Sequence, residues 1–295
     1  MACSISILLR TPDLVVGRFR CTPDDPRWRT INAVTDAVHV VFPWTSVVIE
    51  QLGSEAVLAN PNHVLFFNPE QPYRRTVHDR RGDDAIFVEV SPEVVAACLR
   101  AGAGELPFRL GPSDPQAYLL HYAAVRELMA AATDTLHAEE LVHDAVARSI
   151  ETAALFHGVR GRRGRDRTEQ DRHRLVEATK AILTEEPAAR TTLSGLARRL
   201  HTSEFHLARV FRDRTGFTLH AYRTHLRLRI AIERLADGES DLATLARDLG
   251  FSSHSHFSSA FRSIFGVQPS VVRAIGRRGA RELRRIVEAP LSGSA

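Results

Sequence analysis

The fold of the C-terminal part of the chain is decided by residues 241–266, DLATLARDLGFSSHSHFSSAFRSIFG. Apolar residues recur at intervals of three and four in the first third of this segment and again in its second half, which is the period of an amphipathic helix. Gly250 lies between the two stretches, and glycine readily adopts the positive φ that a tight turn requires. The segment therefore predicts two short helices joined by a sharp turn, a helix-turn-helix motif over about residues 241–264.

An earlier segment, residues 193–216, repeats the pattern as LSGLARRLHTSEFHLARVFRDRTG. Both segments contain Leu-x-x-Leu-Ala-Arg and a later Phe-Arg, so they form an internal repeat with a period of about 50 residues. Thr202 or Ser203 is expected to cap the second helix of this motif, which covers about residues 193–214. Residues 218–236 predict one connecting helix, about 27 Å long at 1.5 Å per residue. That length suits two adjacent major grooves, which lie ~34 Å apart on one face of DNA.

The charges of the chain are divided between its two halves. Residues 1–160 hold 14 arginines and 20 acidic residues, a net charge of −6, whereas residues 161–295 hold 25 basic and 15 acidic residues, a net charge of +10. The two values sum to the overall charge of +4. A basic half that carries two helix-turn-helix motifs is typical of a protein that binds a polyanion such as double-stranded DNA.

Residues 170–273 resemble the DNA-binding domain of the AraC/XylS family of transcription regulators. The matching positions are Leu245-Ala246, Gly250-Phe251-Ser252, Phe257, Phe261-Arg262, Gly266, Pro269 and Arg273, with Tyr222, Arg227 and Ala231 in the connecting helix. Leu219 replaces a frequent proline of the family and Val272 replaces its usual tyrosine, and both changes are compatible with packing. The resemblance implies a sequence-specific DNA-binding transcription regulator, with activator the expected role and repressor left open.

The resemblance also implies that the outward positions of both second helices contact DNA. These are Ser203, Glu204, Phe205, Ala208, Arg209 and Arg212 in the first motif, and His254, Ser255, His256, Ser258, Ser259 and Arg262 in the second. Arg209 has the chemistry for a bidentate pair with guanine, worth about 1–3 kcal/mol of discrimination. Arg212 is expected to neutralise phosphate. Phe205 has two interpretations, contact with a thymine methyl group or a place in the core.

The first half of the chain predicts a different architecture. Short apolar segments alternate with turn residues, which predicts strands at Ile5–Leu9 and at residues 37–42, 45–52, 56–59, 63–67, 74–78 and 85–90. Helices are expected after them, at residues 92–99, 116–132 and 136–156. The apolar stripe of the last of these is either core or the seam of a homodimer, and both interpretations stay open.

The predicted fold class is α+β, with an N-terminal cupin-like β-barrel and flanking helices, then a C-terminal all-α domain of two helix-turn-helix units joined by a linker helix. The cupin-like sensor is implied by the family resemblance, to which residues 68–73 and 87–90 add support. We expect a sensor and dimerisation domain at 1–157, a basic linker at 158–168, the DNA-binding domain at 169–275 and a basic tail at 276–295. Thr168 and Asp171 are expected to form a capping box at the start of the DNA-binding domain.

The resemblance implies a small-molecule effector in the barrel, with Trp44 and Tyr73 as candidates for an aromatic wall.

Cys3, Cys21 and Cys98 are odd in number and lack metal-like spacing. Neither a disulfide framework nor a zinc site is therefore expected. A redox-sensing cysteine is a minor alternative. Histidines 39, 63 and 78 lack the grouping of a metal-binding cupin. His254 and His256 project to different faces of a helix. No metal, cofactor or catalytic residue is therefore expected.

Three other functional classes are alternatives to the effector-controlled regulator. They are a metallo-cupin enzyme fused to a DNA-binding unit, a DNA-alkylation repair activator with a reactive zinc-bound cysteine, and an architectural DNA binder without an effector.

The apolar stretch Ile5–Leu9 lacks the flanks of a signal peptide, and no apolar segment is long enough to cross a bilayer. We therefore expect a cytoplasmic protein without a membrane partner. Its expected partners are double-stranded DNA, a small effector and a second copy of the chain, with RNA polymerase a further candidate.

Overall fold

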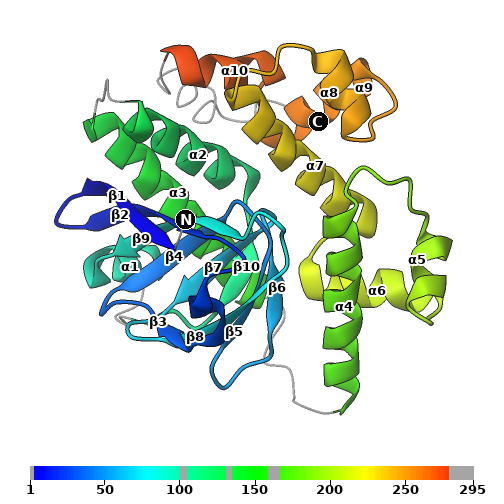
Figure 1. Cartoon of the computed structure of the whole chain (residues 1–295), viewed down its shortest axis with the longest axis horizontal. Coiled ribbons are helices and arrows are strands. Elements are labelled where there is room, and N and C mark those ends of the chain that lie inside the picture. The colour runs from blue at the N-terminus through cyan, green and yellow to red at the C-terminus, as the bar shows by residue number, and fades with distance from the viewer. Residues whose placement is uncertain (1–2, 100–104, 131–134, 159–166, 279–295) are drawn as a thin grey trace. The chain divides into compact units, whose positions relative to one another are not determined.

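The computed structural model describes residues 3–99, 105–130, 135–158 and 167–278 (Figure 1). The chain divides into two compact units. The first comprises residues 1–113 and 149–223, and the second comprises residues 114–148 and 224–295. Both α3 (Thr135–Gly158) and α7 (Leu219–Ala236) begin in one unit and end in the other. The combination of antiparallel sheets and helices confirms the predicted α+β class.

The first unit contains a β-barrel built from two antiparallel sheets (Figure 1). One has the strand order β1-β2-β9-β4-β7-β10 and the other β3-β8-β5-β6. Their bounds are β1 Ser4–Arg10, β2 Leu14–Cys21, β3 Asn32–Ala33, β4 Val38–Pro43, β5 Val47–Gln51, β6 Val57–Ala59, β7 His63–Phe67, β8 Pro72–Val77, β9 Asp83–Val90 and β10 Leu110–Pro112. Side chains from both sheets, including Ile49 and Phe67, meet in one buried cluster, so the core lies between the sheets.

The period-two pattern of the sequence is the cause of this arrangement. In β5, Val47, Ile49 and Gln51 are buried and the residues between them are half-buried, as expected when alternate side chains face opposite sides of a sheet. Gln51 is polar, but its Nε2 donates a 2.7 Å hydrogen bond to the carbonyl oxygen of Phe66, which satisfies the buried amide. The strands expected between residues 37 and 90 are all present, with ends shifted by a few residues.

The strand β2 was not predicted from the sequence, although it pairs with β9 over its whole length. Gly17, Arg18 and Arg20 interrupt its apolar pattern. Gly17 leaves room for the Phe87 ring on β9, because a Cβ at this position would lie 2.2 Å from Cζ of that ring and would displace it. Arg18 is held by Asp84, with a 2.6 Å hydrogen bond from Nη2. Both reasons depend on a partner strand more than 60 residues away in the chain.

The expectation that the cysteines form no disulfide is wrong. Cys3 and Cys21 are joined by a disulfide bond, and both side chains are buried. Antiparallel pairing of β1 with β2 sets Ser4 opposite Arg20, which brings the two flanking cysteines together at the open end of the hairpin. Cys98 is a free thiol. The odd number of cysteines and their spacing could not reveal this pairing because the register of the hairpin decides it.

The first unit also contains helices. They are α1 (Pro92–Leu99), the second part of α3, α4 (Arg167–Glu185), α5 (Leu193–Arg199), α6 (Glu204–Thr215) and the first part of α7. Buried side chains of α4 to α7 form one cluster that contains Leu183, Leu196, Phe211 and Tyr222. Because α4 begins at Arg167, Thr168 lies inside its first turn, and the predicted capping box with Thr168 as the cap is wrong. Most of the predicted linker at 158–168 and most of the predicted basic tail at 276–295 lie outside the described ranges.

The second unit contains α2 (Pro115–Met129), α8 (Leu242–Asp248), α9 (His254–Phe265) and α10 (Pro269–Arg278), with parts of α3 and α7. Asp114 caps α2 by accepting a hydrogen bond from the Ala117 amide at 2.8 Å, and Pro115 occupies the first turn. Every residue of α2 from Ala117 to Val125 is buried. In the described residues, no helix is long and apolar enough to cross a membrane.

The apolar stripe of α3 is buried within the chain itself. Leu141, Val142, Ala145, Val146, Ile150 and Ala153 are each at most 1% exposed. The stripe is therefore core, which was one of its two interpretations. Leu136 and Leu155 are the exposed apolar residues of this helix, at 66% and 71%. A dimer seam on α3 would have to use these side chains and not the stripe.

Arg229, His121 and His225 are three interacting polar residues of the second unit, of which Arg229 and His121 are buried and His225 is half-buried. Arg229 on α7 is 1% exposed, and its guanidinium lies 5.0 Å from the Tyr118 ring centre on α2. Burial, with the positive charge of Arg229 in addition, lowers the pKa of His121 from 6.5 to about 3. The same two causes lower the pKa of His225 to about 3. Both histidines are thus neutral in the folded protein near neutral pH.

We predict that the second unit loses stability in acid. Above pH 6.5 such a histidine is neutral in both the folded and the unfolded chain, so its lowered pKa does not reduce the free energy of unfolding. As the pH falls from 6.5 towards 3, the unfolded chain binds a proton at this residue and the folded chain does not. The free energy of unfolding should therefore fall by about 1.4 kcal/mol per pH unit for each histidine. Urea titrations of His121→Gln between pH 6 and 4 should show a shallower slope than the parent. Exposed His220→Gln is the control, and an unchanged slope in His121→Gln would contradict the assignment.

Candidate DNA-binding helices and effector cavities

The first helix-turn-helix motif is formed by α5 and α6, and a side chain caps each helix. Thr192 Oγ1 accepts a hydrogen bond from the Gly195 amide at 3.0 Å, and Ser203 Oγ accepts one from the His206 amide at 3.2 Å. Ser203, and not the alternative Thr202, is therefore the cap of α6. The inner face of α6 is buried through Leu207, Val210 and Phe211. This burial orients the opposite face of the helix towards solvent.

The second motif, formed by α8 and α9, has the same construction. Asp241 caps α8 by accepting hydrogen bonds from the Ala243 and Thr244 amides, both at 3.0 Å. Ser253 caps α9 through the His256 amide at 3.1 Å. Phe257, Phe261 and Phe265 form the buried face of α9, with neighbouring ring centres 5.8 and 4.9 Å apart. Both α6 and α9 end at a glycine with positive φ, Gly216 and Gly266.

The tight turns of the two motifs use different residues at the same position. Gly250 has a φ of 75°, as the sequence predicts. In the first motif the residue that follows the corresponding leucine is His201, which has a φ of 52°. A residue with a Cβ pays a steric cost in this left-handed region. The repeat therefore preserves the backbone conformation even where it has lost the glycine.

All twelve predicted DNA-contact residues lie at the surface of the protein. Ser258 and Ala208 are half-buried and the other ten are exposed: Ser203, Glu204, Phe205, Arg209, Arg212, His254, Ser255, His256, Ser259 and Arg262. Phe205 is 77% exposed, so its interpretation as a core residue is wrong. An exposed phenylalanine on the outer face of a helix is available for an apolar contact with another molecule.

The two outer faces differ in chemistry. The α6 face carries the guanidinium groups of Arg209 and Arg212, whereas the α9 face is dominated by serine and histidine. His254 Nε2 lies 3.2 Å from Ser258 Oγ, and His256 Nδ1 lies 3.0 Å from Ser252 Oγ. Each histidine thus hydrogen-bonds to its own serine. Among the described residues, neither belongs to a group whose ligand atoms are close enough to share a metal ion.

The interior of the barrel contains a cavity of about 440 Å³. Most of its walls are apolar, with side chains such as Phe19, Val41, Phe67 and Phe87. The polar side chains that line it include two pairs, Arg75 with Asp83 and His39 with Glu89. A concave, largely apolar space with a few placed polar groups is the usual form of a small-molecule site.

The Arg75–Asp83 pair is the most buried charged feature of the cavity. Arg75 Nη1 lies 3.4 Å from Asp83 Oδ2, and the guanidinium lies over the rings of Phe19 and Trp28 at 4.4 and 5.2 Å. Burial raises the pKa of Asp83 to about 6, although the charge of Arg75 acts in the opposite direction. On the other wall, burial lowers the pKa of His39.

The structure separates the two residues expected to form an aromatic wall. Tyr73 lines the cavity and its ring lies 5.0 Å from that of Phe67. Trp44 is not among the lining residues, and its ring is covered by the guanidinium of Arg18 at 4.6 Å. The three barrel histidines are also dispersed: His39 lines the cavity, His63 lines a second pocket, and His78 lines neither.

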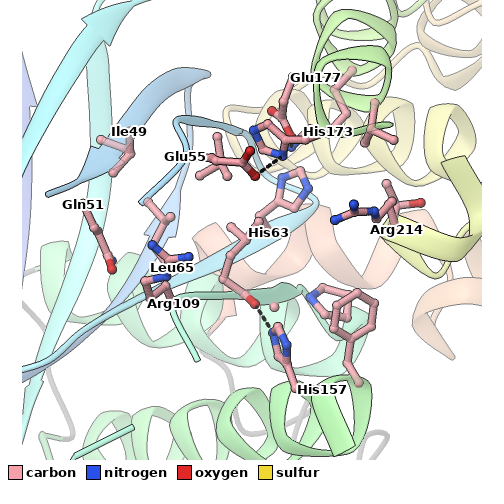
Figure 2. Close-up of a pocket in the computed structure, with 18 residues that line it drawn as sticks. Ile49, Gln51, Glu55, His63, Leu65, Arg109, His157, His173, Glu177 and Arg214 are labelled. Carbon is pink, nitrogen blue, oxygen red and sulfur yellow. Dashed lines mark hydrogen bonds and ion pairs between the residues drawn. The ribbon is translucent and has the colours of Figure 1, made fainter. Parts of the chain in front are cut away.

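The second pocket, of about 250 Å³, lies where β5, β6, β7 and β10 face α4 and the end of α6 (Figure 2). Figure 2 shows a lining rich in charged and imidazole groups, among them Arg109, His173 and Arg214. His173 Nδ1 lies 3.6 Å from Glu55 Oε2. Ile49 and Leu65 line both this pocket and the barrel cavity, so the two spaces share a wall. The sequence did not reveal this pocket because its residues come from distant segments that carry no common motif.

Comparison with known proteins identifies the C-terminal domain. A family model described as a helix-turn-helix domain matches residues 196–275. The RCS-specific transcriptional activator RclR of Escherichia coli K12 is 34% identical over 101 residues, and the transcriptional regulator GlxA of Rhizobium meliloti is 40% identical over 91 residues. The DNA-binding domain belongs to the AraC/XylS family.

Each of these two matches covers only part of this chain and part of the relative. The match with RclR covers 34% of this chain and 36% of the relative, and the match with GlxA covers 30% and 26%. The chain thus spans about a third or less of the length of these curated relatives. Apo ToxT K231A of Vibrio cholerae aligns with 90% of this chain and 98% of its own, at 13% identity and a low TM-score of 0.38.

We predict that the two turns of the AraC/XylS domain respond unequally to exchange of their left-handed residue. Gly250→Ala should lower the free energy of unfolding by about 1–2 kcal/mol, because a Cβ is introduced at positive φ. His201→Gly relieves that strain but adds freedom to the unfolded chain, so its net effect should be within about 0.5 kcal/mol of zero. Urea unfolding of the two variants measures both values. Equal stability of Gly250→Ala and the parent would show that this turn does not need a left-handed residue.

Proposed function

We propose that this protein is a sequence-specific transcription regulator that binds DNA through α6 and α9 and responds to a small molecule held in its barrel. The observation that carries the proposal is the pair of capped helices whose inner faces are buried and whose outer faces present polar, charged and aromatic side chains to solvent. In helix-turn-helix proteins the second helix enters the major groove. The similarity of residues 196–275 to DNA-binding regulators supports the same conclusion.

We infer that α6 specifies bases more strongly than α9. Arg209 lies on the exposed face, one turn after Phe205, where its guanidinium can form a bidentate pair with guanine while the ring contacts a thymine methyl group. Serine and neutral histidine form single hydrogen bonds of lower specificity, so α9 contributes more to positioning. Arg212, one turn further along α6, is assigned to phosphate.

The proposed effector is a small, largely apolar molecule with a polar group. The apolar walls of the barrel cavity would bury its hydrocarbon part, and the Arg75–Asp83 and His39–Glu89 pairs would orient its polar part. A volume of about 440 Å³ is within the range of small-molecule sites. Tyr73 is retained as a candidate contact, whereas the position of Trp44 outside the lining argues against a contact with the effector.

A route from the barrel to the first helix-turn-helix motif is supported by contacts of β6 with α4. Lys180, the only lysine of the chain, is 2% exposed, and its Nζ donates a 2.9 Å hydrogen bond to the Leu58 carbonyl oxygen. Glu177 accepts a hydrogen bond from the Leu58 amide at 2.6 Å and pairs with Lys180 at 2.8 Å. Both backbone groups of one barrel residue are therefore bound by α4. An effector that moves the shared wall of Ile49 and Leu65 would act next to this contact.

We further propose that the regulator acts as a homodimer in the cytoplasm, contacts RNA polymerase and functions as an activator. The exposed Leu136 and Leu155 of α3 are the apolar side chains that favour a protein contact on that helix. The curated relatives are transcription regulators, which supports a regulatory and not an enzymatic role. No catalytic residue is proposed.

We predict that Arg209→Ala and Arg212→Ala weaken DNA binding in different ways. Loss of a guanine contact should remove about 1–3 kcal/mol of discrimination at one base position and leave the salt dependence nearly unchanged. Loss of a phosphate contact should weaken binding to all sequences and reduce the slope of log K against log salt by about 0.9. Genome-wide binding-site mapping identifies the operator, and titrations of operator and scrambled duplexes at several salt concentrations separate the two effects. A uniform loss with a smaller slope in Arg209→Ala would overturn the base assignment.

We predict that filling the barrel cavity removes the response to the effector. Val41 lines the cavity and is half-buried, so Val41→Phe places a ring in the ligand space. Val48 is also half-buried but is not a lining residue, and Val48→Phe is the matched control. Binding of the apolar dye 1-anilinonaphthalene-8-sulfonate should fall at least tenfold in the first variant and little in the second. The mapped promoter, fused to a reporter, should lose its response to growth conditions only in Val41→Phe. Equal behaviour of the two variants would contradict effector control through this cavity.

A further inference from the structure

The disulfide between Cys3 and Cys21 lies at the open end of the β1–β2 hairpin. Ser4, next to Cys3, pairs with Arg20, next to Cys21, so the bond continues the pairing of the two strands by one position. β1 is an edge strand and is hydrogen-bonded only to β2 within its sheet. The disulfide is therefore a covalent bond that holds this edge strand to β2.

The surroundings of Cys3 favour the reactive form of a thiol. Arg75 Nη2 lies 3.6 Å from Cys3 Sγ, and a neighbouring guanidinium stabilises a thiolate. The Cys3 amide donates a 2.8 Å hydrogen bond to Asp25 Oδ2, and Arg27 Nη2 donates one of 2.9 Å to the Cys3 carbonyl oxygen. These backbone contacts hold Cys3 near its partner. Burial raises the pKa of the Cys98 thiol, and so does the negative charge of Glu151, whereas the group next to Cys3 is a guanidinium.

The fastened strand forms part of the wall of the barrel cavity. Ile5 and Ile7 on β1 line the cavity although they are 61% and 47% exposed, so they stand where the cavity meets solvent. Arg75, the contact of Cys3 Sγ, lines the same cavity. A change at the cysteine pair therefore reaches the cavity both through β1 and through Arg75.

We propose that Cys3 and Cys21 form a reversible thiol–disulfide site, and that its oxidation state controls how firmly β1 closes the barrel cavity. With the disulfide intact, β1 is held along β2 and its isoleucines cover the cavity. With the two thiols free, the edge strand separates from β2 more readily and the cavity opens. The thiol chemistry stands independently of the DNA-binding role, whereas its regulatory consequence rests on the proposed effector site.

The oxidant we propose is a peroxide. The Cys3 thiolate attacks one peroxide oxygen, the O–O bond breaks, and a sulfenic acid and hydroxide are formed. The Cys21 thiolate then attacks the sulfenic sulfur; the S–S bond forms, the S–O bond breaks, and the second hydroxide leaves. The cysteines lose two electrons and the two peroxide oxygens gain them. A low-molecular-weight thiol such as glutathione reverses the reaction by thiol–disulfide exchange, with two molecules oxidised to one disulfide.

The same residues offer an alternative that the test must separate. The ligand atoms of Cys3, Cys21 and Asp25 lie within 4.8 Å of one another, an arrangement that two thiolates and a carboxylate could offer to zinc. Asp25 is, however, already engaged by the amides of Cys3 and Arg27, both at 2.8 Å. The joined sulfurs and the engaged carboxylate favour the disulfide over the metal.

The first experiment measures the thiol state of the full chain by alkylation and intact mass. A Cys98→Ser background leaves only the two cysteines of the proposed site. After hydrogen peroxide we expect no alkylated thiol, after excess glutathione two, and after renewed peroxide none again. A pair that stays reduced in peroxide, or stays oxidised in glutathione, would overturn the proposal. So would stoichiometric zinc that is retained by the reduced protein and blocks alkylation.

The second experiment measures amide hydrogen exchange in Ser4–Arg10. Reduction should accelerate exchange across β1 at least tenfold, while β9, held between β2 and β4, should change little. The double variant Cys3→Ser, Cys21→Ser should exchange like the reduced protein with or without peroxide, and Cys98→Ser should respond like the parent. Equal protection of β1 in the two states would reject control of the cavity, even if the thiols react. Neither measurement requires DNA or an effector, so its failure is distinct from a failure of the proposed function.

Discussion

The buried ring of Tyr222 at the start of α7 joins two parts of the first unit that have separate origins in the sequence. Its ring packs edge-on against Phe211, 5.3 Å away, within the core of the first helix-turn-helix motif. Its hydroxyl accepts a 2.8 Å hydrogen bond from Asn60 Nδ2, and its carbonyl oxygen accepts one of the same length from Asn62 Nδ2. Because these asparagines lie between β6 and β7, one residue couples the core of a DNA-binding motif to the barrel. The polar contacts are buried, so breaking either partner leaves an unsatisfied group.

The two helix-turn-helix motifs show how a duplicated scaffold diverges. Both keep a side-chain cap at the start of each helix, an apolar inner face and a left-handed residue in the turn. Their outer faces are not packed into a core and can differ more freely, and one carries arginines whereas the other carries serines and histidines. Base specificity is therefore expected to be unequal between the two motifs, even though their backbones follow the same plan.

The barrel combines a ligand-sized cavity with two walls that have further contacts. One wall, formed by Ile49 and Leu65, is shared with the pocket beside α4, and another, formed by β1, is an edge strand secured by a disulfide. Effector occupancy and thiol oxidation would thus act on different walls of one space. Both proposed signals would therefore reach the apolar side chains that line this cavity.

The helical periods and turn residues of the sequence were sufficient to predict both motifs, the connecting helix and most strands. They also predicted that residues such as Arg209 face outwards. All of these features follow from the local sequence pattern and from the burial of one face of each element. Tertiary structure alone decided the pairing of β2 with β9, the joining of Cys3 to Cys21, the position of Tyr73 in the cavity wall and that of Trp44 outside it. The first three depend on strand register, whereas Trp44 lies in the bend between β4 and β5. Register is set by partners far away in the chain, and a shift of one residue reverses which side chains face the core.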